Sequence, residues 1–530
     1  MTSTRRDWLR QTSLATGAGL LLPQAFSATP EPPRMIELDI ARAEHPVDRF
    51  FDHCVGADYP GTTQRDDCQA QLKTAVDELG FRYLRMHGIF HDVLHTVRRA
   101  ADGTLTFDFS GVAKLYDALL AKRIRPLVEL GFTPAALASS AQTIFYWAGN
   151  TSHPQPEGWE RLLRAFVAFV RGRYGVEEVR HWYFEVWNEP NLAGFWEGAD
   201  QAAYFDLYTR SARVLKSIDP ALKVGGPATA GAAWVAELLA HVKAHDVPID
   251  FVSTHSYGVD GGFLDEKGEQ DTKLSASPDA IVGDVRRVRA QIEASHRPGL
   301  PLFFTEWSTS YNPRDKVHDA YQSAAWILAR LKACQGLAQS MSYWTYTDLF
   351  EEPGPPDRAF HGGFGLMTRD GLRKPAWFAY RYLQALRGRE IPCADAAVWA
   401  SVDDAGTNVE ALLWDQRPVA MGAQSNRDFF GKPRPSVEVP VARLALKNLP
   451  AGRYRLAVHR CGYRANDAYT VYLEMGAPKD LDAAALAKLQ ALTADAPEQQ
   501  RDIEVGADGR ATIELTLREH DVLRVSVRRL

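Results

Sequence analysis

The stretch HWYFEVWNEPNL, residues 181–192, decides the fold of this chain. It begins as a run of aromatic and β-branched residues, which is typical of a strand buried on both faces. The run breaks at Asn188, Glu189 and Pro190. A carboxylate and an amide therefore stand side by side where a hydrophobic strand ends.

Apolar runs of this kind alternate with helical patterns from about residue 50 to 390. The clearest helix covers 159–174, where apolar residues recur at steps of three and four before Gly175. Buried strands separated by helices predict a parallel sheet, and eight such units predict an α/β fold of the (β/α)8 barrel (TIM barrel) type. The strands that we expect are 51–57, 81–87, 124–131, 182–187, 222–226, 251–255, 302–306 and 342–346.

The structural alternative is a doubly wound open sheet. Such a sheet usually carries a G-x-G-x-x-G turn after its first strand. The corresponding segment here, CVGADYPG at 54–61, does not match that pattern. The barrel is therefore the favoured fold.

The 530 residues exceed one ordinary core, so two domains are expected. After residue 390 the pattern changes to alternating apolar and polar residues, which predicts an antiparallel β-sandwich. A candidate further strand of this sandwich precedes the barrel, at 35–41. The predicted parts are an export signal at 1–28, an N-terminal segment at 29–48, the catalytic barrel at 49–390 and the accessory sandwich at 391–530.

The first 28 residues contain the parts of an export signal in their usual order. Arg5 and Arg6 precede a short apolar run at 14–22, and small residues follow it. The run is too short to span a bilayer, so no membrane anchor is expected. The segment resembles twin-arginine signals, which export folded proteins and predict a periplasmic location.

Charge and cysteine content exclude several other functions. The formal net charge is −5 with both signs mixed, and there is no basic tract for nucleic acid. The five cysteines include no C-x-x-C pair, which argues against a zinc ribbon or a redox motif. Cys54 and Cys68 either pair or stay as separate buried thiols. The sequence also leaves open whether the protein is a monomer or a homo-oligomer.

Two glutamates end predicted strands on the same side of the barrel. Glu189 follows the fourth strand, and Glu306 ends the seventh in PLFFTEWSTS, residues 301–310. The carboxyl ends of the strands form the active-site face of such barrels, and a carboxylate pair there is what glycosidases use. Either glutamate alone could cap a helix or form an ion pair. The two together, framed as VWNEP and TEW, favour catalysis.

Both segments resemble the catalytic strands of the large clan of retaining glycosidases. Within that clan the chain resembles glycoside hydrolase family 39, the family of β-xylosidases and α-L-iduronidase. The resemblance covers roughly residues 45–390. It is carried by YLRMHGIFHD (83–92), PLVELGFTP (126–134), VGGPAT (224–229), VSTHSYG (252–258) and FEEPGPPDRAFHGGFGL (350–366).

The resemblance implies the two main catalytic roles. Glu189 is the expected general acid/base and Glu306 the expected nucleophile, with carboxyl groups about 5–5.5 Å apart and retention of anomeric configuration. Asn188 is expected to hydrogen-bond the sugar 2-hydroxyl. When Glu306 becomes a neutral ester, the pKa of Glu189 should fall, which suits its change from acid to base.

The remaining implied residues surround the sugar. Arg85, His255 and Tyr257 are expected around the nucleophile, with Arg85 keeping it ionised and Tyr257 orienting it. The other implied residues are His87 for ring hydroxyls, Phe145 and Phe195 as walls, Trp344 as floor, and Glu352 or its neighbour Glu351 for an outer hydroxyl at the closed end. For Phe145 and Phe195, plain core packing is the alternative.

No metal or cofactor is expected. His87, His91 and His95 are spaced by four residues, which on one helix would suggest a metal site. His87, however, belongs to a predicted strand end, so the three side chains should not share a face. The family resemblance requires no metal either.

The sugar is expected to be neutral. The resemblance implies the motif H-x-K on strand six for the iduronidase branch. This chain has His255-Ser256-Tyr257 at that place, without a lysine to pair with a uronic carboxylate. HGGFGL and the Glu351-Glu352 pair resemble the xylosidase branch. The predicted function is exo-acting hydrolysis of xylooligosaccharides. The alternatives are an α-L-arabinosidase, an endo-acting or iduronidase-like enzyme, or a non-catalytic carbohydrate-binding protein.

Overall fold

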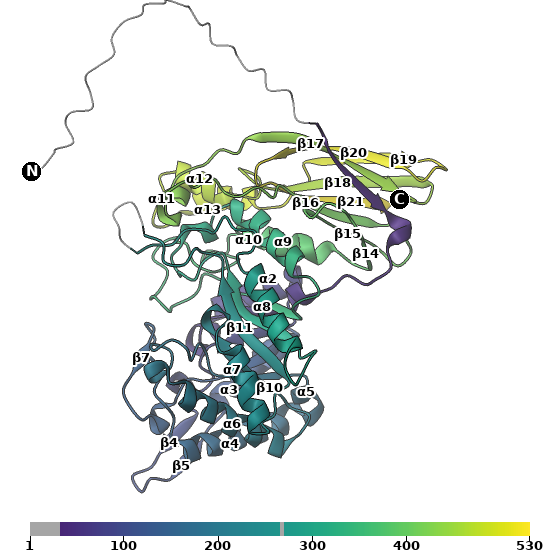
Figure 1. Ribbon diagram of the computed structural model, residues 1–530. Helices are drawn as coiled ribbons and strands as arrows, with labels where there is room; N and C mark the ends of the chain where they lie inside the picture. The colour runs from purple at the N-terminus through teal and green to yellow at the C-terminus, as the bar shows by residue number, and fades with distance from the viewer. Residues whose placement is uncertain (1–31, 265–269) are drawn as a thin grey trace, which may run out of the picture.

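A computed structural model describes residues 32–264 and 270–530 of the chain. The predicted export signal at 1–28 lies outside the described residues. Figure 1 shows two parts, with the barrel in the lower half and the strands β14 to β21 in the upper half. No helix in the described residues is both long enough and apolar enough to cross a membrane.

The lower part is a closed parallel barrel, which confirms the predicted fold class. Tyr343 pairs with Val55 to close the ring. Phe51 lies in the short 3-10 turn η2 (Phe50–Asp52), outside the first strand where it was expected. The eight strands are β2 (Cys54–Ala57), β3 (Tyr83–Met86), β6 (Arg125–Leu130), β9 (Tyr183–Val186), β10 (Lys223–Thr229), β11 (Phe251–Tyr257), β12 (Leu302–Ser308) and β13 (Ser340–Tyr343).

Amphipathic helices cover the outside of the barrel. The helix α4 buries Trp159, Leu162 and Phe166 on one face and ends at Gly175, whose φ of 87° suits glycine. Proline at the first position is compatible with its start, since that N–H has no helical partner. The main helices are α2 (Asp66–Leu79), α3 (Ser110–Ala121), α4 (Pro156–Tyr174), α6 (Gln201–Ile218), α7 (Val235–Ala244), α8 (Val282–Glu293), α9 (Gln322–Cys334) and α10 (Pro375–Ala385).

The barrel interior is layered, because side chains of a strand alternate between its two faces. A lower apolar layer contains Tyr83, Tyr183 and Phe303. Two residues further along the same strands lie Arg85, Glu185 and Thr305, all completely buried. An aromatic plug therefore supports a layer of ionisable and polar groups directly beneath the carboxyl ends of the strands.

The upper part is a two-sheet sandwich. One sheet has the order β14-β15-β16-β21-β18-β19 and the other β1-β17-β20, and side chains from both form one buried core. The strands are β1 (Arg34–Asp39), β14 (Arg389–Ile391), β15 (Val398–Val402), β16 (Val409–Trp414), β17 (Glu438–Lys447), β18 (Gly452–Cys461), β19 (Gln499–Val505), β20 (Ala511–Arg518) and β21 (Val522–Arg529).

The N-terminal strand belongs to this sandwich, as the purple strand among green and yellow ones in Figure 1 shows. It runs parallel to β17, so the sandwich is not purely antiparallel. The strand β14 begins at Arg389, slightly before the expected boundary at 391. Phe430, Tyr469 and Tyr472 join the core of the barrel, so the accessory domain packs firmly against it.

Candidate active site

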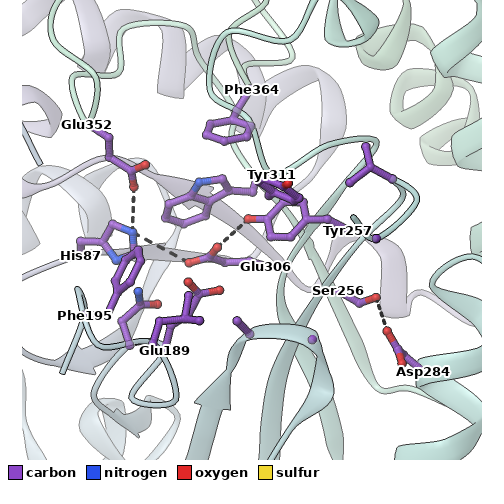
Figure 2. A pocket seen from close by; sticks show the side chains of 17 residues that line it. His87, Glu189, Phe195, Ser256, Tyr257, Asp284, Glu306, Tyr311, Glu352 and Phe364 are labelled. Carbon is purple, nitrogen blue, oxygen red and sulfur yellow. Dashed lines mark hydrogen bonds and ion pairs between the residues drawn. The ribbon is translucent and has the colours of Figure 1, made fainter. Parts of the chain in front are cut away.

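A cavity of about 420 Å³ opens at the carboxyl ends of the barrel strands. This size is typical of small-molecule sites. Figure 2 shows His87 between Glu352 and Glu306, with Glu189 facing Glu306. Predicted residues that line the cavity are His87, Asn188, Glu189, Tyr257, Glu306, Trp344 and Glu352, together with Phe195.

Glu306 is held by donors on two sides. The Tyr257 hydroxyl donates to its Oε2 at 2.6 Å, and Arg85 Nη1 donates to its Oε1 at 2.8 Å. Arg85 is completely buried and also pairs with the carboxylates of Glu129 and Glu185. The two donors fix the orientation of the carboxyl group that is expected to act as the nucleophile.

Glu189 has the opposite environment. It follows β9 with a positive φ of 44°, and its backbone N–H donates to the Ala228 carbonyl at 2.8 Å. Burial raises the pKa of this carboxyl group to about 7, although the charges of His87 and Arg85 oppose the shift. Near neutral pH a substantial fraction of Glu189 therefore carries the proton that a general acid must supply.

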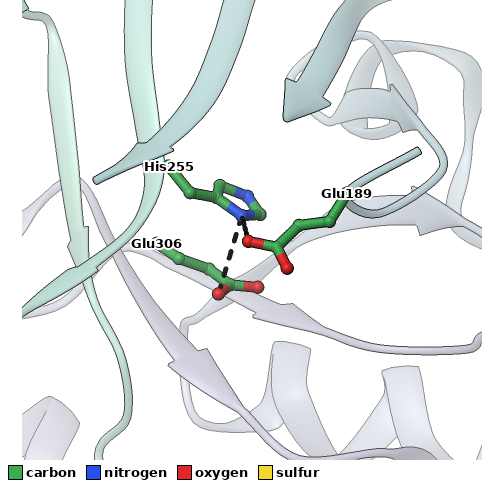
Figure 3. A group of neighbouring side chains, drawn as sticks. All are labelled: Glu189, His255 and Glu306. Carbon is green, nitrogen blue, oxygen red and sulfur yellow. Dashed lines mark hydrogen bonds and ion pairs between the residues drawn. The ribbon is translucent and has the colours of Figure 1, made fainter. Parts of the chain in front are cut away.

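The two carboxyl groups face each other across a short gap. One carboxylate oxygen of Glu189, one of Glu306 and one ring nitrogen of His255 all lie within 4.8 Å of one another (Figure 3). Retaining glycosidases have carboxyl groups about 5–5.5 Å apart and inverting ones about 6.5–9.5 Å apart. The spacing is that of a retaining pair.

These three side chains also have a spacing compatible with a metal ion. Their atoms already have protein partners, because His255 Nδ1 contacts Glu189 at 2.9 Å and Glu306 is held by Tyr257 and Arg85. The histidines spaced by four do not converge in this way. His91 contacts the Trp147 carbonyl at 3.0 Å, and His95 ends the short turn that follows.

The oxygen and the nitrogen of the Asn188 side-chain amide have different environments. Its Oδ1 accepts a hydrogen bond from Arg85 Nη2 at 2.8 Å. Its Nδ2 is buried and has no hydrogen-bond partner among the described residues. Because an unpaired buried donor is costly, this amide is suited to donate to a sugar hydroxyl.

The closed end of the cavity is built around His87. Its Nδ1 contacts Glu129 at 2.8 Å and its Nε2 contacts Glu352 at 3.1 Å. Burial would lower the pKa of His87, but the Glu129 carboxylate raises it well above the usual value. Burial raises the pKa of Glu352 to about 8. Glu352 can therefore donate a hydrogen bond to a sugar near neutral pH, whereas both ring nitrogens of His87 already contact carboxyl groups.

The structure separates the two candidate glutamates at this end. Glu352 lines the cavity, whereas the Glu351 carboxylate accepts a hydrogen bond from Arg65 at 2.8 Å outside it. The two residues open a turn, in which the Gly354 N–H donates to the Glu351 carbonyl at 3.0 Å. Glu351 is therefore not in a position to bind the sugar.

Aromatic residues form the floor and wall. Trp344 packs over Gly56, where an added Cβ would lie 2.2 Å from the indole Cε3. Phe195 lines the cavity, but Phe145 lies behind it, stacked on His87 at 5.7 Å and edge-on to Phe195 at 5.3 Å. Phe145 supports the wall from behind and does not line the cavity.

Sequence reasoning missed several residues of the site. Glu129, Glu185 and Thr305 form the polar layer beneath the carboxylates, and Tyr311 and Phe364 line the cavity. A signal for the first group was present, because carboxylates inside otherwise apolar strands need buried partners. The other two lie in loops, whose path the sequence does not reveal.

Cys54 and Cys68 are both buried free thiols, so the possible disulfide is absent.

The similarity of this chain to known proteins agrees with the geometry of the site. The family model described as "Glycosyl hydrolases family 39" matches residues 34–512. The chain belongs to glycosyl hydrolase family 39. The resemblance seen in its motifs is thereby confirmed, and the protein is a glycoside hydrolase.

Relatives in family 39 cover nearly the whole chain. A β-xylosidase from Caldicellulosiruptor saccharolyticus is 33% identical over 484 residues, which is 91% of this chain and 96% of that protein. The crystal structure of the family 39 enzyme from Xanthomonas axonopodis pv. citri is 60% identical with a TM-score of 0.93, covering 96% of this chain and 100% of that one. A monomeric β-xylosidase from Caulobacter crescentus CB15 is 59% identical with a TM-score of 0.91, covering 94% and 100%.

Proposed function

We propose that this family 39 glycosidase is an exo-acting β-1,4-xylosidase that releases xylose from the non-reducing end of xylooligosaccharides with retention of configuration. The observation that carries the proposal is the spacing of Glu189 and Glu306, whose oxygens lie within 4.8 Å. That gap leaves too little room for a water molecule to act between acid and base, and it suits direct attack by a carboxylate.

The reaction proceeds in two steps. Glu306 attacks the anomeric carbon while Glu189 gives its proton to the glycosidic oxygen, so the aglycone leaves as an alcohol and a glycosyl ester forms. Glu189 then takes a proton from water, the hydroxide oxygen bonds to the anomeric carbon, and the ester bond to Glu306 breaks. Loss of the negative charge on Glu306 lowers the pKa of Glu189 between the steps.

A neutral pentose fits the cavity. The described residues that line it include no lysine or arginine to pair with a uronic carboxylate. Asn188, His87 and Glu352 line the cavity with polar atoms that suit sugar hydroxyls. The relatives from Caldicellulosiruptor and Geobacillus that match the chain are named β-xylosidases, which supports xylose as the sugar.

Exo action is supported by the closed end. His87 and Glu352 are joined by a contact of 3.1 Å across the end of the cavity, where a longer chain would have to pass in an endo-acting enzyme. We expect the terminal sugar of the chain to bind beside these two residues. α-L-Arabinosides share much of the hydroxyl arrangement of xylose, and slower turnover of them is expected.

The test is hydrolysis of aryl β-D-xyloside, α-L-arabinosides, β-D-glucoside and α-L-iduronide by the purified protein and by Glu306→Gln. Preferential turnover of the xyloside, its loss in the variant, and a β-xylose first product in NMR support the proposal. Turnover of another sugar in preference overturns the sugar assignment. An inverted first product, or unchanged activity of Glu306→Gln, overturns the mechanism.

We also propose that the protein is exported. Arg5 and Arg6 ahead of the apolar run at 14–22 support a twin-arginine route to the periplasm. Replacing both arginines with lysine should leave the protein in the cytoplasm of a bacterial host with this route. Unchanged periplasmic activity after that replacement would overturn the route.

A further inference from the structure

Buried side chains connect Arg85 to the proposed acid Glu189 through three intermediates. Arg85 Nε donates to Glu185 Oε2 at 2.5 Å, and the Thr305 hydroxyl donates to Glu185 Oε1 at 2.7 Å. His255 Nε2 lies 3.1 Å from Thr305 Oγ1, and His255 Nδ1 lies 2.9 Å from Glu189 Oε1. Each of the three intermediates is completely buried.

The hydrogen atoms in this series of hydrogen bonds can be assigned by counting the donors and acceptors. A threonine hydroxyl has one hydrogen, and the ionised Glu185, paired with Arg85, can only accept. The hydrogen of Thr305 therefore lies on the line to Glu185. Thr305 must then accept from His255, so Nε2 of that ring carries a hydrogen.

Burial favours a singly protonated ring for His255. Burial lowers the pKa of His255 to about 4 against the attraction of Glu306 and Glu185, while Arg85 and His87 add to the lowering. Glu306 Oε2 lies 3.6 Å from Nδ1, but it already accepts from Tyr257. With its only hydrogen on Nε2, the ring presents a lone pair on Nδ1.

A lone pair on Nδ1 needs a donor, and Glu189 is the group in contact with it. A carboxylate at 2.9 Å from that lone pair would be repelled, whereas a carboxylic acid donates to it. Glu189 is also faced by His87, Arg85, Glu129, Tyr257 and Glu306. Among the described residues, His255 is the side chain in hydrogen-bond contact with its carboxyl group. The network therefore selects the acid form of Glu189.

We propose that Thr305, oriented by Glu185, is a positioning residue that holds His255 in its Nε2–H form and so keeps the proton on Glu189 before the glycosidic bond is cleaved. This inference rests on the proposed acid role of Glu189. The proton leaves Glu189 for the glycosidic oxygen, and the ring of His255 does not change its own protonation.

Removal of the Thr305 hydroxyl should release the ring. In Thr305→Val, Nε2 loses its acceptor, and the hydrogen of His255 can move to Nδ1, where it donates to an ionised Glu189. Hydrogen bonding to the charged form lowers the pKa of a carboxyl group. The variant should therefore lose the acid at a lower pH than the wild type.

The kinetic experiment compares kcat/KM across pH for phenyl and 2,4-dinitrophenyl β-xyloside. For Thr305→Val, the basic limb with the phenyl substrate should move down by about one pH unit, with about tenfold loss above it. The dinitrophenyl substrate, whose leaving group needs no proton, should be affected less than about twofold. Thr305→Ser keeps the hydroxyl and should restore the wild-type profile.

Thr209→Val is the matched control, because it removes a threonine–histidine contact of 2.9 Å to His241, between α6 and α7. It should leave both pH profiles unchanged. Equal loss on both substrates in Thr305→Val would mean a merely structural role and overturns the proposal. An unmoved basic limb overturns it as well.

A neutron structure of the resting wild type near pH 6 tests the assignment without any substrate. It should show deuterium on His255 Nε2 and on Glu189, and none on His255 Nδ1. Deuterium on Nδ1 overturns the proposal even if Thr305→Val does not fold. If the wild type cleaves no xyloside, the proposed function fails while this measurement still decides the proton assignment.

Discussion

The Tyr257 hydroxyl donates to Glu306 Oε2 at 2.6 Å from the neighbouring strand of the barrel. Together with Arg85 on the other oxygen, it holds the carboxylate in a single orientation. Arg85 is completely buried and Tyr257 is partly buried, so both donors are already in place when the carboxylate attacks. This preorganisation favours the reaction more than the strength of either hydrogen bond alone.

Tyr257→Phe should lower kcat by about 10- to 100-fold, the effect of losing one hydrogen bond to a charged group. Steady-state kinetics on aryl β-xyloside would measure it. Tyr382→Phe is the control, because its hydroxyl also donates to a carboxylate, Asp495, at 2.7 Å. It should reduce stability without changing kcat, and similar loss of kcat in both variants would contradict the orienting role.

Glu189→Gln should stabilise the protein at alkaline pH. The pKa of Glu189 is raised from 4.5 to about 7 in the folded state by burial, so the folded protein binds this proton more tightly than the unfolded chain. The free energy of unfolding therefore falls as pH rises from about 4.5 through about 7. Glutamine does not ionise and avoids a loss of up to about 3 kcal/mol.

Urea unfolding of wild type and Glu189→Gln at pH 4 and pH 8 would measure this difference. The variant should gain stability over the wild type at pH 8 and little at pH 4. Glu157→Gln, an exposed position in the first turn of α4, should show no such pH-dependent gain. An equal difference at both pH values for Glu189→Gln would contradict a raised pKa.

Gly56→Ala should disturb the floor of the cavity. The added Cβ would lie 2.2 Å from Trp344 Cε3, so the indole must move. Overpacking of this kind costs about 1–3 kcal/mol of stability, and displacement of the floor should raise KM. Gly172→Ala in α4 meets nothing within 4 Å and should leave KM unchanged while slightly stabilising the helix.

Glu352→Gln and Glu351→Gln should differ sharply. Glu352 lines the cavity beside His87, whereas Glu351 pairs with Arg65 outside it. The first variant should raise KM for xylosides by about tenfold through the altered hydrogen bond, and the second should change it by less than about twofold. Equal effects would show that the sugar reaches both side chains.

Sequence reasoning succeeded where the signal is local. The helix ending at Gly175 and the strand before Glu189 were predicted because apolar periodicity reports on burial directly. Strand limits were less accurate, since Phe51 lies in a 3-10 turn despite its apolar surroundings. The parallel pairing of β1 with β17 was not predicted. It joins segments about 400 residues apart, and their side-chain pattern does not specify strand direction.

The sequence by itself determined the alternation of strands and helices, the change to a β domain, and the positions of Glu189 after the fourth strand and of Glu306 near the end of the seventh, which continues to Ser308. These features follow from periodicity and order along the chain. Only the tertiary structure decided between Glu351 and Glu352, left Cys54 and Cys68 as free thiols, and brought Thr305 into contact with His255 and Glu185. Such choices depend on contacts of a few ångströms between strands far apart in sequence, where a small change in path or register alters every partner.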